Sequence, residues 1–136
     1  MKKISCVLLI CALSGCGTVI ASAQKNNQPT KVKEKMKIEL LYFDSCPSYK
    51  QALANLKEAL KEKNLQADLT LIKVESEEKA ENVGFQGSPS IRINGKDLEG
   101  KDEGFSFSCR LYNTDGKLAA APSKKAIIAK LERLIE

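Results

Sequence analysis

An apolar run that leads to a cysteine–proline pair constrains the fold of this chain more than any other feature. Residues 38–43 are nearly all apolar, Cys46-Pro47 follows, and a helical repeat begins directly afterwards. A thiol at such a junction lies at a helix N-terminus, where unpaired N–H groups and the helix dipole favour the thiolate. The pattern therefore predicts a strand–helix unit with Cys46 at its turn, as a candidate nucleophile or soft-metal ligand.

The remaining apolar patterns predict three more strands and two more helices. Spacings of three and four residues favour helices, and alternation favours strands. The predicted helices are 48–63, 76–82 and the segment after Pro122, and the further strands are 69–74, 90–93 and 105–111. The order is β-α-β-α-β-β-α, which predicts an α/β fold whose central mixed sheet is flanked by helices. The last two strands are expected to form a hairpin-like pair after a turn at Asn94-Gly95, and a further turn is expected at 113–116. The acidic residues Asp97, Glu99, Asp102 and Glu103 lack EF-hand spacing, so we expect them to lie in a solvated loop around 99–104 and not in a calcium site.

The first 35 residues are expected to lie outside this fold. A basic start and a ten-residue apolar stretch, too short to span a bilayer, are typical of a signal peptide. The following Leu-Ser-Gly-Cys, residues 13–16, resembles the lipobox of bacterial lipoproteins. That resemblance implies a signal peptide over 1–15, a lipid on Cys16, a flexible tether over 16–35, a domain over 36–136, and anchoring to a membrane of the bacterial cell envelope. Ordinary secretory cleavage after Ala23 and a retained membrane anchor are the alternatives.

Composition narrows the chemistry further. The chain of 136 residues is the size of one domain and contains no histidine, which excludes Ser-His and Cys-His nucleophile pairs and the common zinc sites. A net charge of +5 without a basic stripe among aromatic residues does not favour nucleic-acid binding. If the signal peptide leaves and Cys16 is lipidated, Cys46 and Cys109 are the remaining thiols. We expect no cofactor, no resident metal and a monomer.

A second motif, Gly87-Ser88-Pro89-Ser90, begins an apolar strand. With Cys46-Pro47 and the order of elements, it resembles the thioredoxin superfamily. The resemblance implies a cis proline that faces Cys46, a backbone around Ser88 and Pro89 that binds an extended peptide, and a substrate site that includes Ser48 and Tyr49. A trans proline at the start of a strand is the alternative.

The family's active site is Cys-x-x-Cys, and Tyr49 occupies its second cysteine position. A neighbouring cysteine normally resolves the mixed disulfide, and Tyr49 cannot. Either an external thiol does so, as in monothiol glutaredoxins, or Cys109 does. Alternatively, Cys109 is a core thiol between Phe107 and Leu111.

Two further segments, 44–47 and 109–112, resemble small thioredoxin-like proteins grouped near alkylmercury lyases, some of which carry selenocysteine at the position of Cys46. The lyases have an acid where this chain has Tyr49, so carbon–mercury cleavage is not predicted. Binding of a soft metal by two thiolates stays open.

The leading hypothesis is a lipid-anchored thiol–disulfide oxidoreductase. In it, the Cys46 thiolate attacks a disulfide, and the partners are protein or small-molecule thiols and disulfides. Two alternatives remain. One is a soft-metal or organomercurial-binding protein that uses Cys46 and Cys109, and the other is a non-catalytic binding module.

Overall fold

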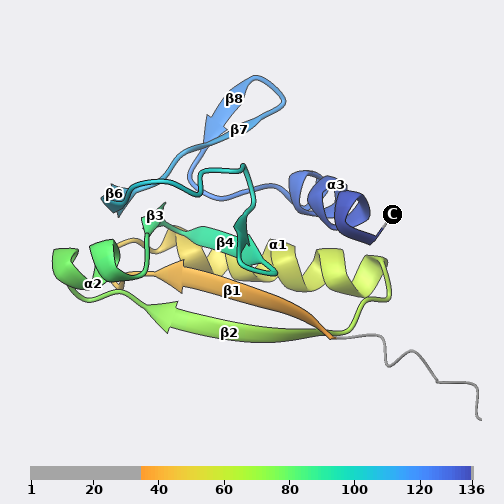
Figure 1. Cartoon of the computed structure of the whole chain (residues 1–136). Helices are drawn as coiled ribbons and strands as arrows, with labels where there is room; N and C mark the ends of the chain where they lie inside the picture. Colours follow the sequence, from red (N-terminus) through yellow and green to blue (C-terminus); the bar gives the residue numbers. More distant parts are fainter. Residues whose placement is uncertain (1–34, 136) are drawn as a thin grey trace, which may run out of the picture. The chain divides into compact units, whose positions relative to one another are not determined.

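The structure is a computed structural model that describes residues 35–135. In this part the chain is a mixed α/β fold (Figure 1). The helices are α1 (Ser48–Glu62), α2 (Glu77–Asn82) and α3 (Lys124–Ile135). The strands are β1 (Met36–Tyr42), β2 (Ala67–Lys73), β3 (Gln86–Ser88), β4 (Ser90–Ile93), β5 (Lys96–Asp97), β6 (Ser106–Cys109), β7 (Tyr112–Thr114) and β8 (Lys117–Ala119).

The predicted signal peptide, Cys16 and nearly all of the tether lie outside the described residues. Between residues 35 and 135, no helix is both long and apolar enough to cross a membrane.

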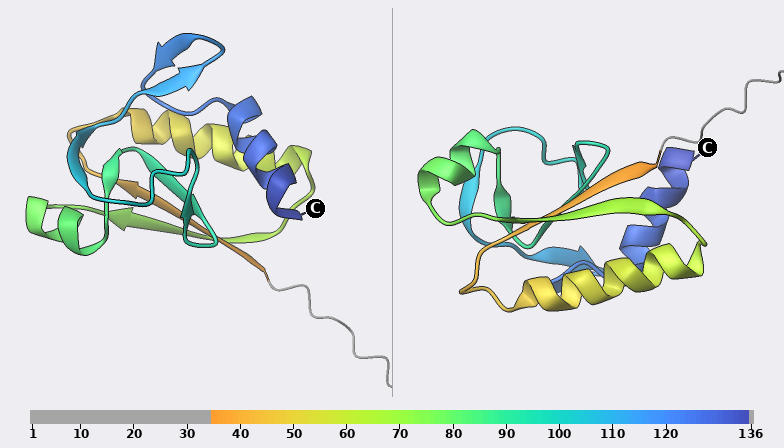
Figure 2. Two further views of the ribbon diagram at one scale, coloured as in Figure 1. Left: turned by 45° about the horizontal axis from the view of Figure 1, so that its top comes forward. Right: turned by 90° about the horizontal axis from the view of Figure 1, so that it is seen from below.

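The central sheet is mixed, as predicted, with the strand order β2-β1-β4-β5. β1 runs parallel to β2 and antiparallel to β4. It is buried on both faces: Leu40 packs with α1 and α3, whereas Leu41 packs with Val74 and Phe85. Figure 2 shows α1 and α3 together on one face of this sheet. β1 therefore packs between two apolar clusters, which fixes the position of the turn that follows it.

Helix α1 forms where the apolar repeat predicts it and ends one residue earlier than expected. Ala52, Leu56 and Ala59 are buried on one side of it, against the sheet and α3. Asn64 follows with a φ of 50°, in the left-handed region that ends many helices. Truncating a buried leucine such as Leu56 to alanine costs about 2–5 kcal/mol, so this packing is a main support of the fold.

The second half of the domain departs from the prediction. The turn at Asn94-Gly95 is present, but the strand that pairs with β4 after it is β5, not the segment 105–111. The carboxylate of Asp97 accepts hydrogen bonds from the N–H groups of Glu99 and Lys101, at 2.9 and 3.2 Å. This turn ends β5 after two residues and directs the chain away from the sheet.

The segment 105–111 instead contributes β6, which lies outside the central sheet and pairs in parallel with β3. A further hairpin, β7–β8, forms at residues 112–119 where the sequence indicated only a turn. Figure 1 shows β6 beside β3 and the β7–β8 hairpin extending beyond it. The predicted second hairpin strand is therefore wrong, and the difference brings β6 to the end of β1.

Candidate redox site

Two sulfur atoms are in contact at the carboxyl end of β1. Sγ of Cys46 lies 3.1 Å from Sγ of Cys109, and both cysteines are reduced. A disulfide bond is about 2.05 Å long, so the two atoms are close neighbours that are not bonded. The predicted approach of Cys109 to Cys46 is confirmed. The alternative, a core thiol between Phe107 and Leu111, is wrong because all three side chains are exposed.

The turn between β1 and α1 places Cys46. Its N–H donates to the carbonyl of Phe43 at 3.2 Å, and α1 begins two residues later. Pro47 occupies the cap position and no side chain caps the helix. The hydroxyl of Ser48 lies 3.0 Å from the Cys46 sulfur, so Ser48 contacts the thiol and does not cap the helix. Unpaired N–H groups and a hydroxyl therefore both lie near this sulfur.

The two thiols differ in access and in acidity. Cys46 is only 4% exposed, whereas Cys109 is exposed. Burial raises the pKa of Cys46, but hydrogen bonds with the side chains of Ser48, Cys109 and Ser88 together outweigh burial and lower this pKa below its ordinary value. The pKa of Cys109 is raised, first by its hydrogen bond to Cys46, then by burial and by the charge on Cys46. Cys46 therefore ionises first, and Cys109 remains a thiol that donates to it.

The proline motif lies beside the same sulfur. The Ser88–Pro89 peptide bond is cis, as the resemblance implied. The carbonyl oxygen of Ser88 lies 3.4 Å from Sγ of Cys46 and accepts a hydrogen bond from the N–H of Arg110 at 2.8 Å. Ser88 is paired with Cys109 in the β3–β6 ladder. In this structure β6 therefore pairs with the backbone at which the resemblance places an extended peptide.

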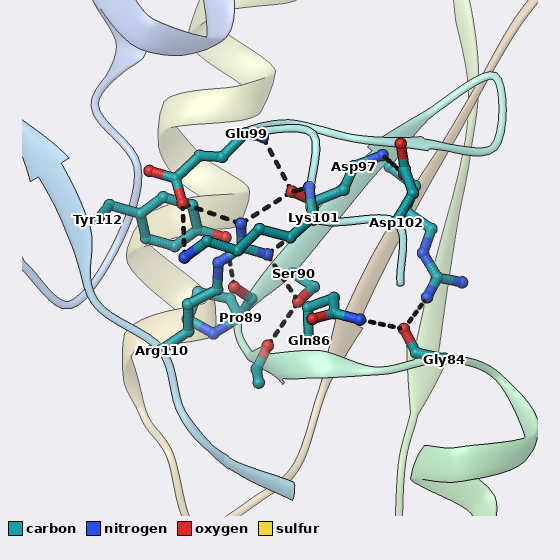
Figure 3. Close-up of polar contacts among 12 residues, drawn as sticks. Gly84, Gln86, Pro89, Ser90, Asp97, Glu99, Lys101, Asp102, Arg110 and Tyr112 are labelled. Carbon is teal, nitrogen blue, oxygen red and sulfur yellow. Dashed lines mark hydrogen bonds and ion pairs between the residues drawn. The ribbon is translucent and has the colours of Figure 1, made fainter. Parts of the chain in front are cut away.

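A buried ionic cluster holds the residue next to Cys109 (Figure 3). The guanidinium of Arg110 donates to both carboxylate oxygens of Asp97, at 2.7 and 2.8 Å, and to Glu99 at 3.0 Å. It also donates to the hydroxyl of Ser90 at 3.2 Å and lies 4.7 Å from the ring centre of Tyr112. The Arg110 and Asp97 side chains are 3% and 1% exposed.

Both partners in this cluster are ionised at neutral pH. Burial raises the pKa of Asp97, but the hydrogen bonds and charge of Arg110 and two backbone N–H groups lower it overall. Burial lowers the pKa of Arg110, but its carboxylate partners raise it overall. The expected solvated acidic loop is therefore wrong for Asp97, which is buried, whereas Glu99 is exposed and still reaches the guanidinium. An arginine within a strand-like apolar stretch could have signalled this arrangement, because a buried guanidinium requires a carboxylate partner.

Further hydrogen bonds tie the β6 segment to the proline motif. The hydroxyl of Tyr112 donates to the carbonyl of Pro89 at 2.6 Å, and the hydroxyl of Ser90 donates to the carbonyl of Gly87 at 2.6 Å. The side-chain amide of Gln86 donates to carbonyl groups that precede β6. Hydrogen bonds thus fix the segments that precede and follow Cys109, and this places Cys109 in contact with Cys46.

A cavity of about 360 Å³ opens at the turn that precedes Cys46, and neither cysteine is among its lining residues. One wall is an aromatic pair, Phe43 and Phe107, whose ring centres are 5.3 Å apart. The other wall is polar: Lys73 forms ion pairs with Asp44 and Glu75, which raise the pKa of Lys73 to about 12. The residues that line it are Phe43, Asp44, Ser45, Lys73, Val74, Glu75 and Phe107. This candidate substrate surface was missed at the sequence level because its two walls come from distant segments.

Tyr49 is not among the residues that line this cavity. Its ring stacks on Tyr42 with ring centres 4.2 Å apart and packs against the main core. Its role in substrate binding stays a prediction, as do those of Ser48, Ser88 and Pro89.

Comparison of the chain with models of protein families, with curated proteins and with solved structures finds no match.

Proposed function

We propose that this protein is a thiol–disulfide oxidoreductase with a thioredoxin-like fold, and that Cys46 and Cys109 are its redox pair. The observation that carries the proposal is the 3.1 Å contact between one sulfur of lowered pKa and one exposed sulfur. Forming a disulfide of about 2.05 Å requires the sulfurs to approach by roughly 1 Å, which a small side-chain rotation supplies.

The arrangement around the pair supports the thioredoxin-like assignment. A β-α-β unit has Cys46-Pro47 at its first turn, and the cis Ser88–Pro89 bond lies beside the thiol. The short β5 and the separate β6 are departures from the expected order. β6 supplies the second thiol that the helix lacks, because Tyr49 replaces it there. We place the enzyme on a membrane of the bacterial cell envelope, through a lipid on Cys16.

The net reaction exchanges two electrons and two protons. The dithiol form of the protein loses both to a partner disulfide, which becomes two thiols, and a Cys46–Cys109 bond forms. The reverse reaction reduces the protein. The lowered pKa of Cys46 increases the fraction of thiolate at a given pH, and the thiolate is the reactive form in thiol–disulfide exchange.

The test is a redox titration of the full chain in glutathione buffers, followed by alkylation and peptide mapping. Trypsin places the two cysteines on separate peptides, 38–50 and 102–110, so a bond between them is unambiguous. We expect a single two-electron transition to a Cys46–Cys109 disulfide, and reduction of insulin disulfides by the reduced protein. If strongly oxidising buffers leave the two peptides unlinked, the proposal is refuted.

The same sulfur contact supports a second candidate, binding of a soft metal by two thiolates. Between residues 35 and 135 no group of three or more metal-ligating side chains gathers, so the metal would have two protein ligands. With metal–sulfur bonds of about 2.3 Å, a linear site separates the sulfurs by about 4.6 Å, so the pair would have to open. Cd²⁺ titration of reduced and of alkylated protein distinguishes the two. Stoichiometric, thiol-dependent binding without redox activity would favour the metal site. A protein that shows neither metal binding nor redox activity would favour a binding module.

A further inference from the structure

We propose that Cys109 is the sulfur that exchanges with the partner, and that Cys46 is the buried sulfur that leaves and later closes the bond. This assignment rests on the proposed function and reverses the roles that the Cys-Pro motif suggests. It makes the strand-borne cysteine the point of contact with a thiol or disulfide substrate.

Access is the first argument. Cys46 is 4% exposed and Cys109 lies directly against it, whereas Cys109 is exposed. Thiol–disulfide exchange proceeds along the line of the breaking sulfur–sulfur bond, and its rate depends on access to the attacked sulfur. A thiolate that arrives from solvent reaches Cys109 with Cys46 behind it. To attack Cys46 with Cys109 behind it, the thiolate would have to approach a sulfur with almost no exposed surface.

The leaving group is the second argument. A sulfur of lower thiol pKa leaves faster, and hydrogen bonding to the departing thiolate helps it leave. The hydroxyl of Ser48, 3.0 Å away, and the start of α1 both stabilise a thiolate on Cys46. Cys109 has no comparable support, and its own thiol pKa is raised. The disulfide therefore breaks faster with Cys46 as the leaving thiolate than with Cys109 as the leaving thiolate.

The rigidity of β6 is the third argument, because a mobile strand would uncover Cys46. The N–H of Arg110, the residue next to Cys109, donates to Ser88. The Arg110 side chain forms the buried ion pair with Asp97. Gly87 brings the two strands close: a Cβ there would lie 3.0 Å from the carbonyl oxygen of Ser108. β6 therefore stays over Cys46 during exchange.

In the reducing direction, an external thiolate attacks Sγ of Cys109, the Cys46–Cys109 bond breaks, and Cys46 departs as a thiolate. A second external thiolate attacks the external sulfur of the mixed disulfide and releases Cys109, which takes up one proton. In the opposite direction, Cys109 passes its proton to the Cys46 thiolate 3.1 Å away and attacks the partner disulfide, which releases one partner thiolate. Cys46 gives that proton to the released thiolate, attacks Cys109, and frees the second partner sulfur.

The test is a rapid-quench reaction of the oxidised full chain with reduced glutathione. Samples are quenched with acid within the first turnover, treated with N-ethylmaleimide, and digested with trypsin. We expect glutathione on peptide 102–110 and N-ethylmaleimide on peptide 38–50, by at least ten to one. The oxidised protein unfolded in urea is the control, and it should give a nearly even distribution because access no longer differs.

The two proposals fail in different ways. If oxidation forms no Cys46–Cys109 disulfide, the proposed function fails before this question arises. If the disulfide forms and glutathione is found mainly on peptide 38–50, or evenly on both peptides of the folded protein, only the assignment of roles is overturned. Variants that lack one of these two cysteines give a second measurement. With oxidised glutathione, Cys46→Ser should form a stable mixed disulfide on Cys109, and its absence in a folded variant also overturns the assignment.

Discussion

Replacing Asp97 with asparagine should destabilise the domain strongly although it removes no atom from the packing. The change leaves the guanidinium of Arg110 buried, with Glu99 at 3.0 Å as its only carboxylate partner. Breaking a buried ion pair by neutralising one partner costs about 3–5 kcal/mol. Because Glu99 remains, we expect the lower end, about 3 kcal/mol, and for a domain of this size roughly 12–24 °C in melting temperature.

Urea unfolding followed by circular dichroism measures this loss. Asp68→Asn is the matched control, because Asp68 pairs with Lys35 at 3.5 Å on the surface, where its side chain is 61% exposed. Its effect should stay within about 0.5 kcal/mol. A loss below about 1 kcal/mol for Asp97→Asn would refute the argument that this ion pair supports the β6 segment.

The pH dependence of the free energy of unfolding gives a second test of the Asp97–Arg110 ion pair. The pKa of Asp97 is lowered in the folded state, so its contribution is complete above the pKa of an exposed aspartate, about 3.9, and is lost as the pH falls through the lower folded value. The stability gap between wild type and Asp97→Asn should therefore be constant from about pH 8 to about pH 5 and shrink below about pH 4. A gap that already closes near neutral pH would contradict this.

Three further predictions concern the site itself. Gly87→Ala should weaken formation of the Cys46–Cys109 disulfide in glutathione buffers, because a Cβ would press on β6; Gly100→Ala has a similar positive φ without such a contact and should not. Tyr112→Phe should cost about 1–3 kcal/mol in urea unfolding, because the buried carbonyl that accepts its hydrogen bond loses its partner. Iodoacetamide labelling against pH should give a lower midpoint for Cys46 than for Cys109; the reverse order would contradict the assigned thiolate.

The sequence predicts the parts of this fold that depend on neighbouring residues. The apolar run of β1, the repeat of α1 and the turn at Asn94 are local patterns, and each is found near its expected place. The pairing of β6 with β3 depends on contacts between distant segments, and alternation along 105–111 does not say which strand is its partner. The Arg110–Asp97 ion pair was missed for the same reason, because charge patterns suggest a solvated loop unless the burial of both side chains is known.

The pairing of β6 with β3 instead of β4 is also what brings the two cysteines into contact. Had 105–111 paired with β4 as expected, Cys109 would lie one strand away from the strand that leads to Cys46. Because Asp97 ends β5 early and then binds Arg110, the chain crosses to β3 and presents Cys109 opposite Ser88. In the proposed function, the strand that supplies the second thiol thus occupies the backbone where an extended substrate was expected. In this proposal a partner therefore meets an exposed cysteine on a strand, and β6 already pairs with the backbone beside the proline.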